Sequence, residues 1–301
     1  MDRTIMLTAL RSPALGLTLA MAITGTVGAF VVETKLDPAT VVFWRCVFAS
    51  LFLIGWCLVR GSFSRGSISV RGLAVATLAG VCLVLNWVAF FAGFSLTTIA
   101  TTTIVYHVQP FFVVLIGTLF LNERVSAPQL VWMCCAFTGV ALASGAVGNG
   151  AVLDVRWLLG IGLTLMAAFL YAITTILAKQ IGGQRPEVTA LCQTVTGVVL
   201  LLPFAAPAIV VPTAAWGWLI GVGVLHTGIA YVLMYASYPH LATSVIAILT
   251  FVYPLVAILI DWAIYHHALG PVQGIGLALI AGATSGHRLG WSLPPRRRVS
   301  E

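Results

Sequence analysis

Polar groups and a helix-distorting residue lie together in an otherwise apolar stretch, IVYHVQPFFVVLIG, from Ile104 to Gly117. Tyr106, His107 and Gln109 can donate and accept hydrogen bonds, and an imidazole can also carry a proton near neutral pH. One helical arc of about 160° holds Thr102, Thr103, Tyr106, His107, Gln109 and Pro110. This arc predicts a surface that binds a small solute.

The same chemistry recurs later in the chain, where Thr250 and Tyr253 precede Pro254. A proline inside a helix removes a backbone hydrogen bond and kinks the helix. We interpret Pro110 and Pro254 as two hinges beside one cavity. A packing kink without motion is the alternative for both.

An aromatic stripe provides a third group of candidate residues. One helical arc of about 140° holds its members: Asn86, Trp87, Phe90, Phe91 and Phe94. Such a stripe can be core, lipid-facing surface or the wall of a binding site. As a binding wall, it would favour a substrate with an aromatic or apolar body.

Three further ionisable groups lie in apolar surroundings. His226, like His107, could carry a proton or could form hydrogen bonds as a neutral ring. Arg45 and Asp261 could pair with each other, bind the carboxylate and ammonium of a zwitterion, or extend to the membrane interface.

Catalytic chemistry has little support in the sequence. It lacks the patterns HExxH, GxSxG and GxxxxGK[ST], and its apolar runs contain no paired carboxylates. The six cysteines show no metal-ligand spacing and fall in apolar runs, as small buried residues do. We therefore expect no catalytic residues, no metal, no cofactor and no ATP motor in this chain.

The elements that position these residues must be membrane helices. The 301 residues are 60% hydrophobic and 8% charged, with a mean hydropathy of +1.06, which is too apolar for a soluble domain. Ten apolar runs are long enough to span a bilayer: 13–33, 39–59, 72–94, 98–121, 127–146, 156–178, 187–206, 213–236, 241–263 and 271–288. Lipid cannot satisfy open backbone groups, so we predict an all-α integral membrane protein with ten transmembrane helices. The first run is interpreted as a retained span, because no cleavage site follows it.

The basic residues predict the orientation. With both termini in the cytoplasm, 12 of the 15 Lys and Arg residues lie on the cytoplasmic side, 2 on the opposite side and 1, Arg45, within a span. This distribution accounts for the net charge of +7 without nucleic acid as a partner. The Arg296–Arg298 tail could also contact anionic lipid headgroups.

Internal matches predict two related halves. GLTL occurs at Gly16–Leu19 and again 146 residues later, and Pro110 and Gln129 recur 144 residues later as Pro254 and Gln273. Five spans are an odd number, so the second half enters the membrane inverted, as in many secondary transporters. We divide the chain into a first repeat (1–146), a linker (147–155), a second repeat (156–288) and a basic cytoplasmic tail (289–301).

Two segments carry a resemblance to the EamA-type members of the drug/metabolite transporter superfamily: Phe91 to Ser126 and Gly223 to Leu259. Pro110 followed by Glu123 and Arg124 resembles a family motif, and Arg45 matches a family arginine of the second helix. His267 departs from the pattern, because the family usually has glutamate there. The resemblance implies ten helices in two inverted five-helix repeats. Within the family, the chain is most similar to bacterial aromatic amino acid exporters.

Together these features predict a secondary transporter of the bacterial inner membrane that exports small metabolites, such as aromatic or apolar amino acids, by alternating access. A carrier or flippase for nucleotide-sugar or lipid-linked substrates, and a passive solute channel, are the alternatives. Small residues at every fourth position of 270–286 predict a close contact with the fifth span or with a second copy, so a homodimer is possible. The predicted substrate-binding residues are Asn86, Trp87, Phe90, Tyr106, His107, Gln109, His226, Thr250 and Tyr253.

Overall fold

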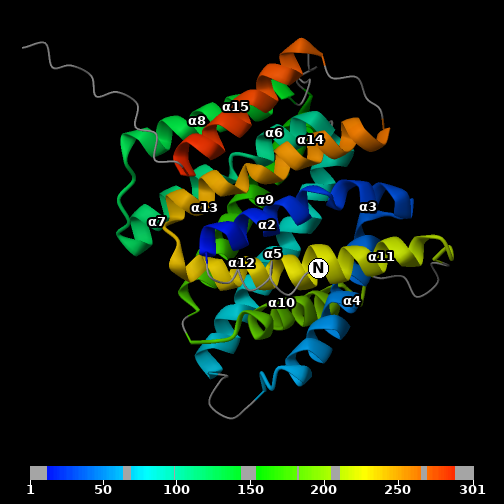
Figure 1. Cartoon of the computed structure of the whole chain (residues 1–301). Coiled ribbons are helices and arrows are strands. Elements are labelled where there is room, and N and C mark those ends of the chain that lie inside the picture. The colour runs from blue at the N-terminus through cyan, green and yellow to red at the C-terminus, as the bar shows by residue number, and fades with distance from the viewer. Residues whose placement is uncertain are drawn as a thin grey trace, which may run out of the picture.

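The computed structural model describes residues 12–63, 69–97, 99–143, 154–181, 183–204, 211–265 and 270–288. Every regular element in those ranges is a helix, and long helices cross one another at shallow and steep angles in a layered bundle (Figure 1). The all-α prediction is therefore confirmed for the described residues.

The described residues of the first half form seven helical segments in five apolar regions. They are α2 (Pro13–Gly25), α3 (Val27–Thr34), α4 (Pro38–Val59), α5 (Val70–Leu96), α6 (Ile99–Tyr106), α7 (Gln109–Leu121) and α8 (Ala127–Ala143). The pairs α2/α3 and α6/α7 are each one apolar region with a break inside it.

The second half repeats this order with more breaks. Its segments are α9 (Val155–Gln180), α10 (Pro186–Leu201), α11 (Ala215–Gly223), the π-helix η1 (Val224–Ile229), α12 (Ala230–Ser237), the short η2 (Tyr238–His240), α13 (Thr243–Thr250), α14 (Val252–Tyr265) and α15 (Pro271–Arg288). A helix or a run of helices thus occupies each of the ten predicted regions.

Length distinguishes two groups among these regions. Seven helices of the described residues are long and apolar enough to cross a membrane, whereas 127–143, 186–201 and 271–285 form shorter apolar helices. The ten predicted regions are therefore all present, but the three short ones do not meet the length of a full span by themselves.

The packing of the two halves follows one pattern. In the first half, α5 and α7 both contact α9, the first helix of the second half. In the second half, α12 and α14 both contact α2, the first helix of the first half. Equivalent helices also contact each other in the pairs α4/α10 and α8/α15, and the fourth and ninth regions contact each other through α7 and α13. These contacts are those expected of two related five-helix units. The joint near 147–155 lies almost entirely outside the described residues.

The α8/α15 contact, seen at the top of Figure 1, confirms that the tenth region packs on the fifth. A Cβ atom on Gly139 would lie 2.7 Å from the Gly276 carbonyl oxygen, and one on Gly276 would lie 2.6 Å from the Gly139 carbonyl oxygen. The predicted stripe does not form this contact with the fifth region, because Gly274 and Gly282 have no such neighbours within 4 Å. Whether that free side binds a second copy stays a prediction.

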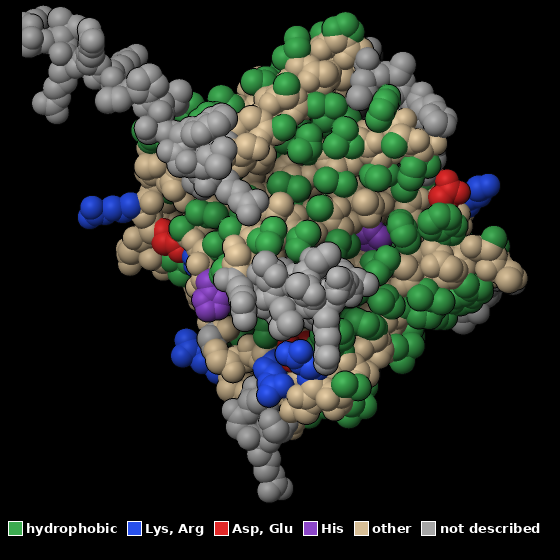
Figure 2. All heavy atoms as spheres, viewed as in Figure 1, with side chains coloured by type: hydrophobic (Ala, Val, Ile, Leu, Met, Phe, Trp, Pro, Cys, Tyr) green, Lys and Arg blue, Asp and Glu red, His purple; other side chains and the backbone are tan. Residues whose placement is uncertain are grey.

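The outer surface is largely apolar. Side chains such as Val59, Phe120 and Val199 are exposed. Figure 2 shows hydrophobic side chains across much of the visible face, with Lys and Arg at its left and right edges and in its lower part. Such a surface matches hydrocarbon better than water.

Candidate functional site

The two prolines end their helices in the same register. Helix α6 ends at Tyr106, four residues before Pro110, and α13 ends at Thr250, four residues before Pro254. A proline lacks the amide that would bond the carbonyl four residues earlier and clashes with it. The predicted kinks are therefore confirmed, while their movement stays a prediction.

The two breaks face each other through the ring of His107. Its centroid lies 5.8 Å from that of Tyr253, nearly parallel, and 6.2 Å from that of Phe251. The Nδ1 atom lies 2.6 Å from the Thr103 carbonyl oxygen, to which it donates a hydrogen bond. His107 thus joins the fourth and ninth regions, one from each half.

Two other predicted residues near the breaks differ in their available chemistry. Gln109 is buried, and its Nε2 has no hydrogen-bond partner among the described residues. Thr250 is also buried, but its hydroxyl donates to the Ile246 carbonyl within its own helix. Gln109 therefore retains donor capacity for a solute, whereas the hydroxyl proton of Thr250 is used locally.

Asn86 and Tyr106 form the polar centre of the aromatic stripe. Asn86 Nδ2 donates to the Tyr106 hydroxyl at 3.1 Å and to the Ala167 carbonyl at 2.7 Å. The centroid of the Tyr106 ring lies 4.3 Å from that of Phe90 and 6.2 Å from that of Tyr171 of α9. Asn86, Phe90 and Tyr106 thus form one contiguous group, whereas the Phe94 side chain lies outside the described side chains.

Trp87 faces a row of tyrosines from the second half. Tyr231, Tyr235 and Tyr238 follow one another along α12 and η2 with centroid separations of 5.5 and 5.9 Å, and Trp87 lies 6.2 Å from Tyr231. Tyr235 donates a hydrogen bond to Gln193 Oε1 of α10. We call Trp87, Tyr106, Tyr171, Tyr231, Tyr235 and Tyr253 the central aromatic cluster.

Arg45 of α4 lies within this cluster. Its guanidinium carbon is 4.1 Å from the centroid of the Trp87 ring, and its Nε donates to Thr227 Oγ1 at 2.6 Å. Its exposed fraction is only 7%. Extension to the membrane interface is therefore wrong for Arg45, because Trp87 and Thr227 hold the guanidinium inside the protein. The Asp261 side chain lies outside the described side chains.

His226 belongs to a separate group of contacts. Its Nδ1 donates to the Gly221 carbonyl at 3.2 Å, and its Nε2 lies 2.8 Å from the Thr26 hydroxyl at the α2/α3 break. The Phe30 ring packs 4.6 Å from the His226 ring. The structure does not bring His226 together with His107, and its connection to the cluster runs through the adjacent Thr227.

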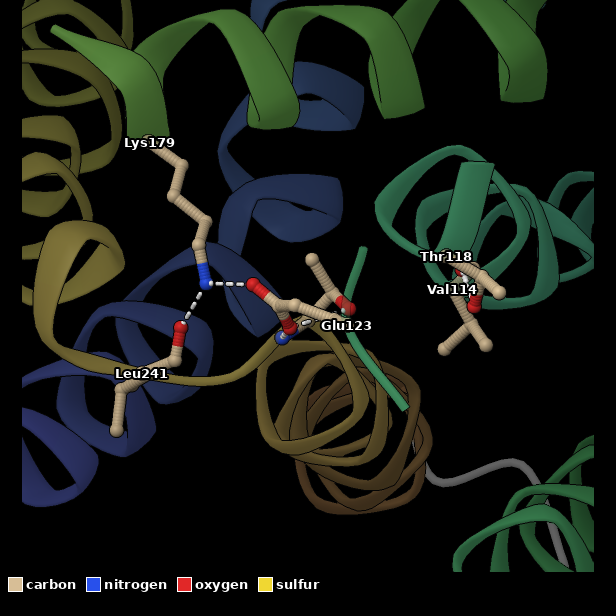
Figure 3. A network of polar contacts seen from close by, with 6 residues as sticks. Val114, Thr118, Glu123, Lys179 and Leu241 are labelled. Atoms are coloured by element: carbon tan, nitrogen blue, oxygen red, sulfur yellow. Dashed lines mark hydrogen bonds and ion pairs between the residues drawn. The ribbon is translucent and has the colours of Figure 1, made fainter. Parts of the chain in front are cut away.

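One network ties the two halves together at the ends of α7 and α9 (Figure 3). Glu123 forms a 2.6 Å ion pair with Lys179 and accepts hydrogen bonds from the amide and hydroxyl of Thr243 at 2.7 and 2.9 Å. Lys179 also donates to the Leu241 carbonyl. Burial raises the pKa of Glu123, but the hydrogen bonds from Lys179 and Thr243 outweigh it, so the net pKa is lowered. The predicted motif residue Glu123 thus holds the α12–α13 connection against α9.

A cavity of about 220 Å³ lies beside the cluster in the second half. Its lining includes Gln184, Thr189, Tyr235 and His240. Two buried amide atoms nearby have no hydrogen-bond partner among the described residues, Gln184 Oε1 and Gln193 Nε2. Tyr235 is shared by this cavity and the central aromatic cluster, because it lines the one and belongs to the other.

Comparison with known proteins places this architecture in a family. Residues 13–145 and 158–286 each match the model of the EamA-like transporter family. The chain belongs to the EamA-like transporter family. The EamA-like chain is accordingly a multi-span membrane protein of a transporter family.

Relatives of this EamA-like chain that are named for a solute are named for different ones. The uncharacterized transporter YxxF of Bacillus subtilis is 33% identical, over 87% of this chain and 85% of its own length. A probable terminal-alkyne amino-acid exporter of Streptantibioticus cattleyicolor is 24% identical, over 86% and 96%. A riboflavin transporter of Rhizobium johnstonii is 26% identical, over 84% and 81%. The fold also matches a crystal structure with a TM-score of 0.79 at 16% identity, over 92% of this chain and 96% of that one.

Sequence reasoning missed several residues that this EamA-like structure places in the cluster or directly against it. They are Tyr171, Gln193, Tyr231, Tyr235 and Tyr238, while Arg45 had been noticed but not assigned to the site. A spacing of four and then three residues puts the last three tyrosines on one helical face. That spacing was available in the sequence and would have found them.

Proposed function

We propose that this EamA-like transporter exports small metabolites, with aromatic or apolar amino acids as its substrates, by alternating access across the bacterial inner membrane. Both termini lie in the cytoplasm in this proposal, and transport involves no catalytic step or cofactor. The observation that carries the proposal is the central aromatic cluster, which side chains of both halves build around Asn86 and Arg45.

The chemistry of the cluster supports an aromatic or apolar substrate. Rings that pack edge to face or stacked, as Trp87 and Tyr231 do, offer both area and favourable quadrupole contacts to another ring. Gln109 Nε2 and Gln193 Nε2 are buried donors without partners among the described residues, and a polar substrate group can satisfy them. One relative, named as a probable terminal-alkyne amino-acid exporter, also supports an amino acid as the substrate.

The alternating mechanism is supported by the positions of the helix breaks. The fourth and ninth regions break in the same register and meet at His107 and Tyr253. Broken helices near the interface of two repeats are typical of secondary transporters. A passive channel would favour a continuous polar lining, which the rings of the cluster do not provide.

One other substrate class has an observation in its favour. The riboflavin transporter among the relatives suggests that a flat heterocycle could enter an aromatic site. Nucleotide-sugar or lipid-linked substrates are less favoured, since Arg45 is the one cation whose described contacts lie in the cluster, and phosphate groups call for several donors.

Proteoliposomes test the proposal directly. Purified protein should take up labelled phenylalanine or tryptophan faster than glycine, and a pH gradient across the membrane should reveal whether protons are coupled. Trp262→Ala, which removes an exposed ring away from the cluster, should transport like the parent. Preferential uptake of riboflavin, or equal uptake of all amino acids, would contradict the amino acid selectivity.

A further inference from the structure

Arg45 is a buried cation without a carboxylate partner among the described side chains. It belongs to α4 of the first half, yet its hydrogen-bond acceptor, Thr227, belongs to η1 of the second. The ion pair that the described residues do form joins Lys179 and Glu123, at the end of the bundle rather than in the cluster. A buried charge without a counter-ion is costly, and an anion that binds beside it offsets that cost.

The contacts of Arg45 fix its orientation without an anion. Thr227 donates its hydroxyl hydrogen to the Val222 carbonyl at 3.0 Å, so its oxygen is left to accept from Arg45 Nε. The guanidinium lies over the Trp87 ring, and its carbon is 6.0 Å from the centroid of the Tyr231 ring. Nε is the inner donor of the guanidinium, and the two terminal nitrogens form the planar fork that binds a carboxylate in a bidentate manner.

The π-helix is what brings the Thr227 hydroxyl to this position. In η1 the Thr227 and His226 side chains both bond carbonyls five residues earlier, those of Val222 and Gly221. Gly223, just before η1, lets α4 approach closely, because a Cβ there would lie 2.5 Å from the Cβ of Phe48 and 3.1 Å from the Arg45 carbonyl oxygen. Such π-helical turns recur at functional sites.

We propose that Arg45 binds the carboxylate of the transported substrate, while Trp87 and the tyrosines of α12 contact its aromatic body. This inference rests on the proposed function and deepens it, because it assigns the charged group of the substrate to one residue. The substrate class is an aromatic carboxylate. Thr227 is a positioning residue that aims the guanidinium.

Binding to purified protein tests the inference with four small probes. Phenylalanine and phenylacetate carry the carboxylate, whereas phenylalaninamide and phenethylamine have the same ring without it. The parent should bind the two carboxylates roughly 10- to 100-fold more tightly than their counterparts, the scale of a hydrogen bond to a charged group. Equal binding of phenylalanine and phenylalaninamide by the parent would overturn the inference without any variant.

Variants then test whether the preference for carboxylates depends on Arg45. Arg45→Gln should abolish the preference for carboxylates and leave phenylalaninamide binding nearly unchanged, Arg45→Lys should restore part of it, and Thr227→Val should weaken it. Arg71→Gln, which removes an exposed arginine of α5, is the matched control and should bind like the parent. Equal weakening of phenylalanine and its amide by Arg45→Gln would assign Arg45 a structural role and overturn the inference.

Two further outcomes separate this inference from its rivals and from the proposed function. If Arg45→Gln lowers stability and the double variant Arg45→Gln/Asp261→Asn restores it, Arg45 pairs with Asp261 and the inference fails. If phenylacetate binds in an Arg45-dependent manner but phenylalanine is neither bound nor transported, the amino acid function fails while the carboxylate site stands.

Discussion

His107 and Tyr253 stack with their ring centroids 5.8 Å apart and their planes within 22° of each other. His107 lies at the break between α6 and α7, and Tyr253 lies one residue before Pro254 in the broken region α13/α14. Bending at either proline therefore moves a ring that the other broken region contacts. We therefore expect movement at one break to be transmitted to the other through this pair.

Replacing Pro110 with alanine should slow transport without loss of stability. Alanine restores a backbone donor and favours a continuous helix from α6 into α7, which opposes the bent state. Pro254→Ala should also slow transport but favour the opposite facing, because the halves are predicted to be inverted. Transport rates and the labelling of single cysteines on each side of the bundle measure these two effects.

The matched control is Pro271→Ala at the start of α15, where a missing amide costs no helical hydrogen bond. It should transport like the parent. If Pro110→Ala and Pro254→Ala also keep the parent rate and labelling pattern, the prolines are packing features and not hinges.

The predicted inversion can be tested by labelling from one side. In a background without native cysteines, Asn149→Cys in the joint should react with an impermeant reagent applied outside the cell, and Phe63→Cys should not. Phe63 is a suitable probe because its side chain is exposed, whereas the neighbouring Ser62 is fully buried and bonds Glu187. Labelling of both residues from the same side would contradict the inverted repeat.

The presence or absence of a proline explains why some helix breaks could be predicted from the sequence and others could not. A proline acts on its own helix, so kinks at Pro110 and Pro254 could be predicted without knowledge of any neighbour. The break at Thr26 and the π-helix at Val224–Ile229 have no proline. They depend on contacts between distant segments, such as that of Thr26 with His226, which no periodicity encodes.

The same division applies to the candidate site: features within one helix could be predicted, and contacts between distant segments could not. The stripe of Asn86, Trp87 and Phe90 and the arc of Tyr106 and Gln109 could be read from helical spacing within single runs. The burial of Arg45 could not, because it depends on Thr227, which lies 182 residues away in the sequence. A charged residue near the start of an apolar run can extend outward or inward, and tertiary packing decides between these.

Trp87→Ala should reduce affinity for aromatic amino acids more than for aliphatic ones. Trp87 is 7% exposed and supplies ring area to both Arg45 and Tyr231. Loss of the ring contact should cost aromatic substrates about 1 kcal/mol in apparent affinity. Competition binding with phenylalanine and leucine measures the difference, with exposed Trp262→Ala as the control. Equal loss for both substrates would point to a general collapse of the core.

The Glu123 network should hold the two halves closed at the end of the bundle that bears Lys179. Glu123→Gln removes the ion pair while keeping the size of the side chain, at a cost of about 1.5–3 kcal/mol for bonds to a charged group. A cysteine at Ala236, beside the cavity, should then react faster with a soluble thiol reagent at pH 7. Thr118→Val is the matched control, because Thr118 lies near the network but bonds the Val114 carbonyl instead (Figure 3).

The pKa of Glu123 gives this network a pH dependence of known sign. Its folded pKa lies below the usual value of 4.5, so the carboxylate stabilises the fold fully above about pH 4.5. That contribution is lost as the pH falls through the lowered pKa. The Tm of the parent should therefore fall more steeply below pH 4.5 than the Tm of Glu123→Gln, which has no carboxylate at this position. Other acids such as Asp37 titrate in both proteins and cancel in the difference between the two curves. Parallel curves would mean that Glu123 contributes no net stability and that its ion pair with Lys179 does not hold the halves together.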